Sequence, residues 1–397
     1  MAEPIDIETS SAVDLVLELM AIPGPPCEER EVAERIVGHL KRAGVKASQI
    51  AFDQAHKRSP FGGNTGNLFV DLPGRGTQCR APRIMLSTHM DTVPICLSST
   101  PVFKNRNRVV SKGRKAGIGA DNRSGCAALI ATARELIRQK LDHPPVTLLF
   151  MIQEEIGLVG AHFADRKMLR KPAFAVNVDG GDPREVCIGS IGGKKWKALI
   201  HGVPAHAGVH PEDGVSAASI FAIAHATLLE KGLHGKIVKG KRSGTANIGM
   251  LYGGEATNVV MDRLGITGEC RSHNASFLNR LVGDYEKTLR DAARKVKNSS
   301  KTSGRIEFTL ENEYPPSRVA KTSLPCRRVA DAMKRLGLTP AYKVVDGGVD
   351  AAFLNTVHRI PAVTIGAGAH SPHTVDEYLV VSEYINGCRL LLGVVTA

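Results

Sequence analysis

The sequence is poor in aromatic residues and has no closely spaced cysteines. Phenylalanine, tyrosine and tryptophan make up 5% of the 397 residues, and there is a single tryptophan. The eight cysteines are scattered without a C-x-x-C pair, so neither a thiolate zinc site nor a disulfide framework is indicated. Any metal site in this chain would therefore use histidine, aspartate and glutamate.

Long apolar runs are also missing. The longest compact run lies around residues 146–152, far short of the roughly 20 residues that span a bilayer. The first ten residues are acidic and lack the basic start and the apolar stretch of a secretory signal. We therefore expect a soluble, cytoplasmic protein with no membrane partner.

Charge is unevenly distributed between the two signs. The chain has 52 lysines and arginines against 39 acidic residues, a net charge of +13, which could attract nucleic acid or anionic substrates. Basic residues cluster within 104–115 and 231–242, but no helix-turn-helix, aromatic RNA-binding signature or zinc finger accompanies them. We interpret these clusters as solvated surface and expect no nucleic-acid partner.

The length favours two domains. Apolar strands alternating with helical patterns at both ends of the chain predict an α/β domain with a doubly wound mixed sheet. The middle has strands around 197–201 and 245–251 and helices around 216–231 and 274–297, which is typical of an inserted α+β domain. The expected boundaries are 1–193 and 314–397 for the two parts of this α/β domain and 194–313 for the insertion.

Within the α/β domain, the apolar periodicity predicts one long helix over 10–40 that stops before Gly44, and another over 126–138. Short buried strands are expected at 67–72, 84–88, 146–152, 173–178 and 362–366.

Acidic and histidine side chains follow the ends of these strands. Ligands bind at the carboxyl edge of open α/β sheets, because strand ends and helix starts leave a crevice and unpaired backbone groups there. Hard oxygen and imidazole donors at several strand ends suit a dinuclear hydrolytic site. The candidates are His89, Asp91, Glu154, Glu155, Asp179 and His373, with Asp121 at the start of a helix.

Each candidate also has a simpler interpretation when taken alone. His89 and Asp91 share a strand face, so Asp91 could orient the imidazole, but a surface pair has the same spacing. Asp121 could be a helix-capping acid, and Asp179 a turn residue before two glycines. His373 could simply cap the segment that follows it.

Glu154 and Glu155 differ from an ordinary solvated pair because they end a strongly apolar run. Neighbouring side chains point in different directions, so one glutamate could bind metal while the other faces the substrate as a general base. That division would supply two functions from consecutive positions.

Five segments together carry a family resemblance. In order along the chain they resemble the metal-site motifs of the aminoacylase/carboxypeptidase family of di-zinc peptidases, and most closely its peptidase T branch of tripeptide aminopeptidases. The segments are Ser87-Thr-His-Met-Asp-Thr-Val, Gly119-Ala-Asp-Asn-Arg-Ser-Gly, Glu154-Glu-Ile-Gly-Leu-Val-Gly-Ala, Asn177-Val-Asp-Gly-Gly and Gly366-Ala-Gly-Ala-His-Ser-Pro-His-Thr-Val-Asp-Glu.

The resemblance implies a role for each candidate. His89 and Asp179 would bind one zinc ion, and Glu155 and His373 the other. Asp121 would bridge the two ions, ahead of a cis peptide bond to Asn122. Asp91 would orient His89, and Glu154 would be the general base. Cobalt or manganese could fit the same nitrogen and oxygen ligands.

The inserted domain resembles the lid and dimerisation domain of the same family. By position, His206 would reach the active site, while Asn258 and Arg271 would contact a substrate carboxylate. A strand-end histidine, a turn amide and a surface ion pair are the simpler alternatives. The resemblance also implies a homodimer formed through this domain.

The resemblance thus implies a zinc-dependent exopeptidase acting on short peptides. Two departures put the preference for tripeptides in doubt: the usual Asp-Asp-Lys-Ala-Gly is Asp121-Asn-Arg-Ser-Gly, and the usual His-Pro-Gly is His206-Ala-Gly. An N-acyl-amino-acid deacylase or a dipeptidase with the same metal site is the main alternative. A non-catalytic binding protein on this scaffold is the second.

Overall fold

The computed structural model describes residues 6–396, which group into two compact units. One unit runs up to Ser190 and resumes at Ser317; the other is the continuous stretch Ile191–Pro316. The boundaries expected from the sequence, after 193 and after 313, lie close to these divisions. Residues 1–5, which belong to the stretch used to argue against a secretory signal, lie outside the described part.

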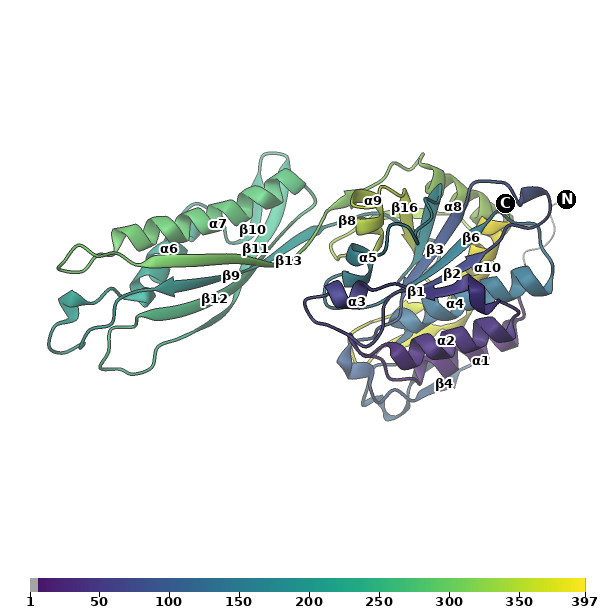
Figure 1. Cartoon of the computed structure of the whole chain (residues 1–397), viewed down its shortest axis with the longest axis horizontal. Coiled ribbons are helices and arrows are strands. Elements are labelled where there is room, and N and C mark those ends of the chain that lie inside the picture. Colours follow the sequence, from purple (N-terminus) through teal and green to yellow (C-terminus); the bar gives the residue numbers. More distant parts are fainter. Residues whose placement is uncertain (1–5, 397) are drawn as a thin grey trace. The chain divides into compact units, whose positions relative to one another are not determined.

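The first unit is built on a nine-stranded sheet (Figure 1). Its main path runs in the order β1-β2-β6-β3-β7-β16-β8-β14, with β15 beside β8. The neighbours β6, β3, β7 and β16 are parallel, whereas β1, β2, β8 and β14 provide antiparallel pairings. The strands are β1 Ile50–Phe52, β2 Leu68–Leu72, β3 Ile84–His89, β6 Val146–Met151, β7 Phe174–Val178, β8 Glu185–Ser190, β14 Ser317–Arg318, β15 Ala341–Val345 and β16 Ala362–Ile365.

Helices lie on both sides of this sheet (Figure 1). They are α1 Thr9–Met20, α2 Arg30–Arg42, α3 Ala55–Arg58, α4 Ala120–Arg138, α5 Val159–Phe163, α8 Leu324–Arg335, α9 Ala351–Thr356 and α10 Val381–Val395. The predicted mixed α/β fold class is confirmed. A small second sheet in the order β17-β18-β5-β4 adjoins the C-terminal segment, with β4 Pro101–Asn105, β5 Arg108–Ser111, β17 Ala369–His370 and β18 Tyr378–Val380.

Alternation along the strands separates the two faces of the large sheet. Ile84 and Leu86 of β3 belong to the apolar core formed with α1, α2, α4, α8 and α10. Side chains two residues apart share a face, so Met85, Ser87 and His89 point to the opposite face. Helix α9 contacts β7 and β16, yet its buried residues are not part of that core. It therefore covers the same face as His89.

The prediction of one helix over 10–40 was wrong. The chain leaves α1 after Met20 and enters α2 at Arg30, because the prolines Pro23, Pro25 and Pro26 between them cannot continue a helix. The segment between the two helices contacts the buried side chain of Arg123. The carbonyl of Ile22 accepts a hydrogen bond from Arg123 at 3.2 Å.

The second unit contains an antiparallel sheet in the order β10-β11-β12-β9-β13 and two helices. Its elements are β9 Gly192–His201, β10 Gly235–Lys239, β11 Arg242–Gly253, β12 Arg263–Ser272, β13 Arg305–Tyr314, α6 Ala217–Glu230 and α7 Ala275–Lys295. Its own apolar core surrounds Trp196, whose ring lies 5.3 Å from that of Phe308 and 5.2 Å from that of Tyr285. A separate core is what an independent domain requires.

Within residues 6–396, none of the helices combines the length and the apolar character needed to traverse a bilayer.

Candidate metal centre

The sequence candidates of the first unit meet at one edge of the large sheet. His89 is the last residue of β3, Asp179 directly follows β7, and Glu154 follows β6 after two further residues. The amide of Asp179 still donates to the carbonyl of Ile365 on β16 at 2.8 Å, so the strand pairing continues up to this edge. Because β3, β6 and β7 are parallel neighbours, their carboxyl ends bring the three side chains together.

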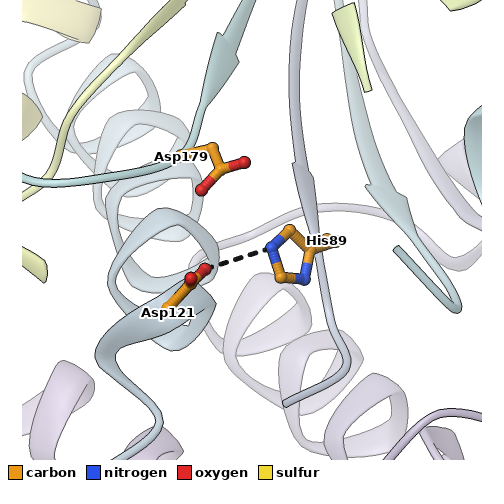
Figure 2. Close-up of side chains that lie close together, drawn as sticks. All are labelled: His89, Asp121 and Asp179. Atoms are coloured by element: carbon orange, nitrogen blue, oxygen red, sulfur yellow. Dashed lines mark ion pairs between the residues drawn. The ribbon is translucent and has the colours of Figure 1, made fainter. Parts of the chain in front are cut away.

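Three groups of side chains have ligand atoms within 4.8 Å of one another. Figure 2 shows the first, in which Asp121 and Asp179 lie on one side of the His89 imidazole. The three groups are His89 with Asp121 and Asp179, His89 with Glu154 and Glu155, and Asp121 with Glu155 and His373. The first and third share Asp121, which is the arrangement that the family resemblance implies. Their roles as ligands stay a prediction.

The distances inside these groups are short. Nε2 of His89 lies 3.3 Å from Oδ1 of Asp121, and Nε2 of His373 lies 2.9 Å from Oε2 of Glu155 and 3.7 Å from Oδ2 of Asp121. Oδ1 of Asp121 is buried, and its contact with His89 lacks hydrogen-bond geometry. A carboxylate that faces one imidazole with each of its two oxygens is suited to receive cations.

Asp91 joins two of these segments. Nδ1 of His89 lies 3.2 Å from the backbone carbonyl oxygen of Asp91 and 3.4 Å from its Oδ1. The two carboxylate oxygens of Asp91 accept hydrogen bonds from the backbone amides of Glu154 and Glu155, both at 3.0 Å. Asp91 is fully buried. Asp91 therefore joins the segment of His89 to the chain that carries both glutamates, while its role in orienting the imidazole stays a prediction.

Glu377 fixes the segment that leads to Asp121. Its carboxylate accepts hydrogen bonds from the amides of Ile118 and Gly119 at 2.8 Å and of Asp121 at 3.0 Å. It lies four residues after His373, so it ties the His373 loop to Asp121. This role of Glu377 was not predicted from the sequence. The available signal was its position as the last residue of the last family motif.

The start of α4 adapts to the sheet beneath it. The peptide bond between Asp121 and Asn122 is cis, as the resemblance implies, and the Asn122 amide donates to the carbonyl of Val178 at 2.6 Å. Gly125 allows the helix to approach β3 closely, because a Cβ there would lie 2.2 Å from Oγ1 of Thr88. The glycine of this motif thus serves packing.

The electrostatics reflect crowded acids. Shielding from solvent is the main reason why the pKa of Asp179 is raised to about 7, and the neighbouring charge of Asp121 adds to the rise. The pKa of Glu155 is raised by the same shielding although His373 opposes it. Hydrogen bonding to Glu155 raises the pKa of His373 to about 9. Acids held in this way need positive charge, so the donor set fits divalent metal ions.

The other predicted site residues belong to the second unit. His206 is exposed and its Nδ1 accepts a hydrogen bond from the amide of Gly208 at 3.2 Å. The carbonyl of Asn258 accepts from Ala207 at 2.9 Å, which brings Asn258 beside His206. Arg271 forms a two-pronged ion pair with Glu269, at 3.0 and 3.1 Å. The substrate roles of all three stay predictions.

Three buried charged residues near the site were not recognised in the sequence. Glu29 accepts hydrogen bonds from the amides of Cys27 and Gln153. Arg123 is also fully buried and lies close enough to Glu29 for their charges to interact. Asp350 is fully buried at the start of α9. None of the three lies in a sequence pattern that indicates function. Glu29 and Asp350 each precede a helix, where an acid is commonly interpreted as a helix cap.

Metal affinity should rise with pH. In the metal-free protein His373, with its pKa of about 9, holds a proton at neutral pH, and Asp179 is partly protonated. A metal ion must displace those protons, so we expect the apparent association constant to increase about tenfold per pH unit between pH 7 and 9, and more steeply below pH 7. Calorimetric titration with Zn²⁺ in buffers of different ionisation enthalpy measures both the affinity and the protons released.

His373→Ala provides the matched control for this measurement. The variant should bind more weakly and show a flatter pH dependence between pH 7 and 9. An affinity of the parent protein that does not change over this range would contradict the assignment of His373 to a metal.

Comparison with known proteins agrees with this geometry. Over residues 85–397, well over half of the chain, the sequence matches the model of "Peptidase family M20/M25/M40". The protein YqjE of Bacillus subtilis is 29% identical over 380 residues, which cover 96% of each chain.

Solved structures give the same result. The aminopeptidase PepT from Bacillus cereus superposes with a TM-score of 0.83 at 27% identity, covering 98% of both chains. A tripeptidase from Staphylococcus aureus superposes with a TM-score of 0.85 at 25% identity, again over 98% of both chains. The chain therefore belongs to peptidase family M20/M25/M40 and is a hydrolase acting on peptide bonds.

Proposed function

We propose that this protein is a zinc-dependent exopeptidase that removes residues from short peptides, with a specificity like that of peptidase T. The observation that carries the proposal is the pair of ligand groups that share Asp121, with Glu154 beside them. Similarity over the whole length to an aminopeptidase and a tripeptidase supports the same conclusion.

Five side chains would hold the metal ions. His89 and Asp179 would bind one ion, Glu155 and His373 the other, and Asp121 both. Two bound zinc ions would lower the pKa of a shared water and polarise the carbonyl of the scissile peptide. The nitrogen and oxygen donors would also accept cobalt or manganese.

Glu154 would act as the general base. Shielding from solvent raises the pKa of Glu154 well above the usual range, with His89 opposing this rise and Asp179 adding to it. A raised pKa suits a carboxylate that takes a proton from the attacking water and returns it near neutral pH. As the new carbon–oxygen bond forms and the carbon–nitrogen bond breaks, the same proton would pass to the leaving amine.

Three residues of the second unit have proposed substrate roles. His206 would donate a hydrogen bond to the oxyanion, while Asn258 and Arg271 would bind the peptide carboxylate. Both prongs of the Arg271 guanidinium are paired with the Glu269 carboxylate, so a substrate carboxylate would have to replace Glu269 there.

A homodimer through the second unit and a cytoplasmic location are part of the proposal. Met250 and Tyr252 of β11 lie two residues apart and so share one face of the sheet, and both are exposed, at 61% and 53%. An apolar patch of this kind is typical of a protein interface.

A panel of three substrates tests the proposed function. The zinc-loaded protein should hydrolyse a tripeptide with the highest kcat/KM, a dipeptide less well, and an acetylated amino acid least. A deacylase would prefer the acetylated amino acid, and a binding protein would turn over none of them while still binding zinc.

Glu154→Ala should abolish turnover without releasing metal. Loss of a positioned general base lowers kcat by about 10²–10⁴-fold, and Glu154 is outside the two ligand groups that share Asp121. Steady-state kinetics together with zinc analysis of the purified variant measure both effects.

Glu34→Gln, which removes an exposed acid from α2, is the control and should keep full activity. Near-normal peptidase activity of Glu154→Ala at full zinc content would show that the base lies elsewhere.

Met250→Asp should convert the dimer to a monomer. A charge placed in an apolar interface must be desolvated without a partner, which weakens association. Sedimentation equilibrium should give twice the 42.5 kDa chain mass for the parent protein and 42.5 kDa for the variant. A monomeric parent protein at micromolar concentration would remove this part of the proposal.

A further inference from the structure

A cavity with basic walls lies within the first unit, apart from the metal centre. Its volume is about 740 Å³, and residues of the segments 166–172 and 356–360 line it. The lining includes Arg166, Lys171 and Arg359, and none of the described lining residues is acidic. The cavity therefore gathers three positive charges without a carboxylate to balance them.

The cavity lies at the edge of the large sheet opposite to the metal centre. Pro172 lies two residues before the start of β7, and Ile360 lies two residues before the start of the parallel neighbour β16. The amide of Ala175 donates to the carbonyl of Pro361 at 2.8 Å, which holds the two segments side by side. Asp179 follows the other end of β7, and the extended chain from Pro172 to Asp179 spans about 20 Å. A ligand in the cavity would thus be separate from the metal ions.

The three cations have no partners within the described chain. None of their side chains forms an ion pair or a hydrogen bond with another described residue, whereas Arg170 of the same segment lies 3.3 Å from the Asp71 carboxylate. All three are exposed. A concave site lined by charge of one sign focuses the electrostatic field and attracts ions of the opposite sign.

His358 shows the effect of this field on a neighbouring group. Its Nε2 donates to the carbonyl of Ala161 at 2.8 Å, which fixes the ring in the cavity wall. Burial is the main reason why the pKa of His358 is lowered, and the positive charges of Arg166 and Arg58 lower it further. The imidazole is therefore neutral at pH 7, and the permanent charges of the lining are those of the three cations.

Two of the three cations occupy unusual backbone positions. The angle φ is 48° at Lys171 and 58° at Arg359, in the left-handed region that favours glycine and asparagine. A long basic side chain gains nothing from such a turn, and backbone outliers of this kind are concentrated at ligand sites. The side chains at these two positions are thus better explained by a ligand than by the shape of the loop.

The chemistry of the lining indicates the class of ligand. The planar guanidinium groups of two arginines and the ammonium group of a lysine are the donors that bind phosphate oxygens in proteins. Much of the remaining lining is apolar, and it comprises Leu169, Pro172, Val357 and Ile360. The volume is within the range of about 300–1,000 Å³ that is typical of small-molecule sites. The cavity therefore has room for an organic group beside the charged one.

We propose that this cavity binds a small organic phosphate. Arg166, Lys171 and Arg359 would hold the phosphate oxygens, and the apolar wall would contact the organic group. A phosphate monoester carries about two negative charges at neutral pH, so it balances the three cations better than a single carboxylate does. The site goes beyond the proposed function and does not depend on it.

Calorimetric titration of the zinc-loaded protein with adenosine 5′-monophosphate tests the inference. The monophosphate should bind saturably, while adenosine and inorganic phosphate, the two halves of this probe, should each bind at least about tenfold more weakly. Arg166→Gln and Arg359→Gln should each weaken binding of the monophosphate about tenfold or more, because each removes charge-assisted hydrogen bonds. Both positions are exposed, so two independent variants are available that leave the core unchanged.

Lys334→Gln is the control, because it removes one exposed positive charge from α8 without changing the cavity. This variant and His373→Ala should both bind the monophosphate as the parent protein does. Equal weakening in Lys334→Gln would reduce the effect to general positive charge and overturn the inference. Loss of binding in His373→Ala, with binding retained in both arginine variants, would place the phosphate on the metal ions and also overturn it.

The parent protein supplies two further outcomes that would overturn the inference. One is the absence of saturable binding of the monophosphate up to about 10 mM. The other is equal affinity for the monophosphate and for either of its halves, since the cavity would then not recognise an organic phosphate.

Discussion

Negative charge gathered at one buried sheet edge is the constraint on which the rest of this structure depends. Asp121, Glu155 and Asp179 converge there with two imidazoles, and shielding from solvent raises the pKa of two of the three acids. Such an arrangement costs folding free energy in the absence of cations, because each acid must be desolvated beside others. Binding of metal ions would offset this unfavourable free energy, so the stability of this unit and its proposed chemistry are coupled.

Two further carboxylates fix the backbone that carries the predicted ligands. Asp91 binds the amides that carry the two glutamates, and Glu377 binds the amides that lead to Asp121. Both acids are buried, and both join segments that are far apart in sequence. Preorganisation of this kind lets loops carry a precise site, since the loop backbone is fixed by bonds from elsewhere in the fold.

The edge that carries the predicted ligands could be located from the sequence because the end of each parallel strand can be recognised from the residues around it. Each apolar run marks a strand, and the residue after it must lie at the edge, so His89 and Asp179 needed no knowledge of tertiary contacts. The prediction of one long N-terminal helix was wrong because it gave more weight to the apolar periodicity than to the three prolines that interrupt it. Glu377 could not be found in this way, since its importance lies in the amides that surround it after folding. Lys171 and Arg359 could not be found either, because they are far apart in sequence and line one cavity only in the folded chain.

The structure also changes what the departures from the peptidase T motif imply. At Asp121-Asn-Arg-Ser-Gly, Asn122 binds the carbonyl of Val178 and Arg123 is enclosed, with its guanidinium so close to Gly24 that a Cβ there would lie 2.6 Å away. These side chains support the sheet edge from the interior, so they do not line a peptide site. The substitution in His206-Ala-Gly is different, because His206 is exposed on the second unit. We therefore expect any difference in peptide preference from peptidase T to arise from residues of that unit.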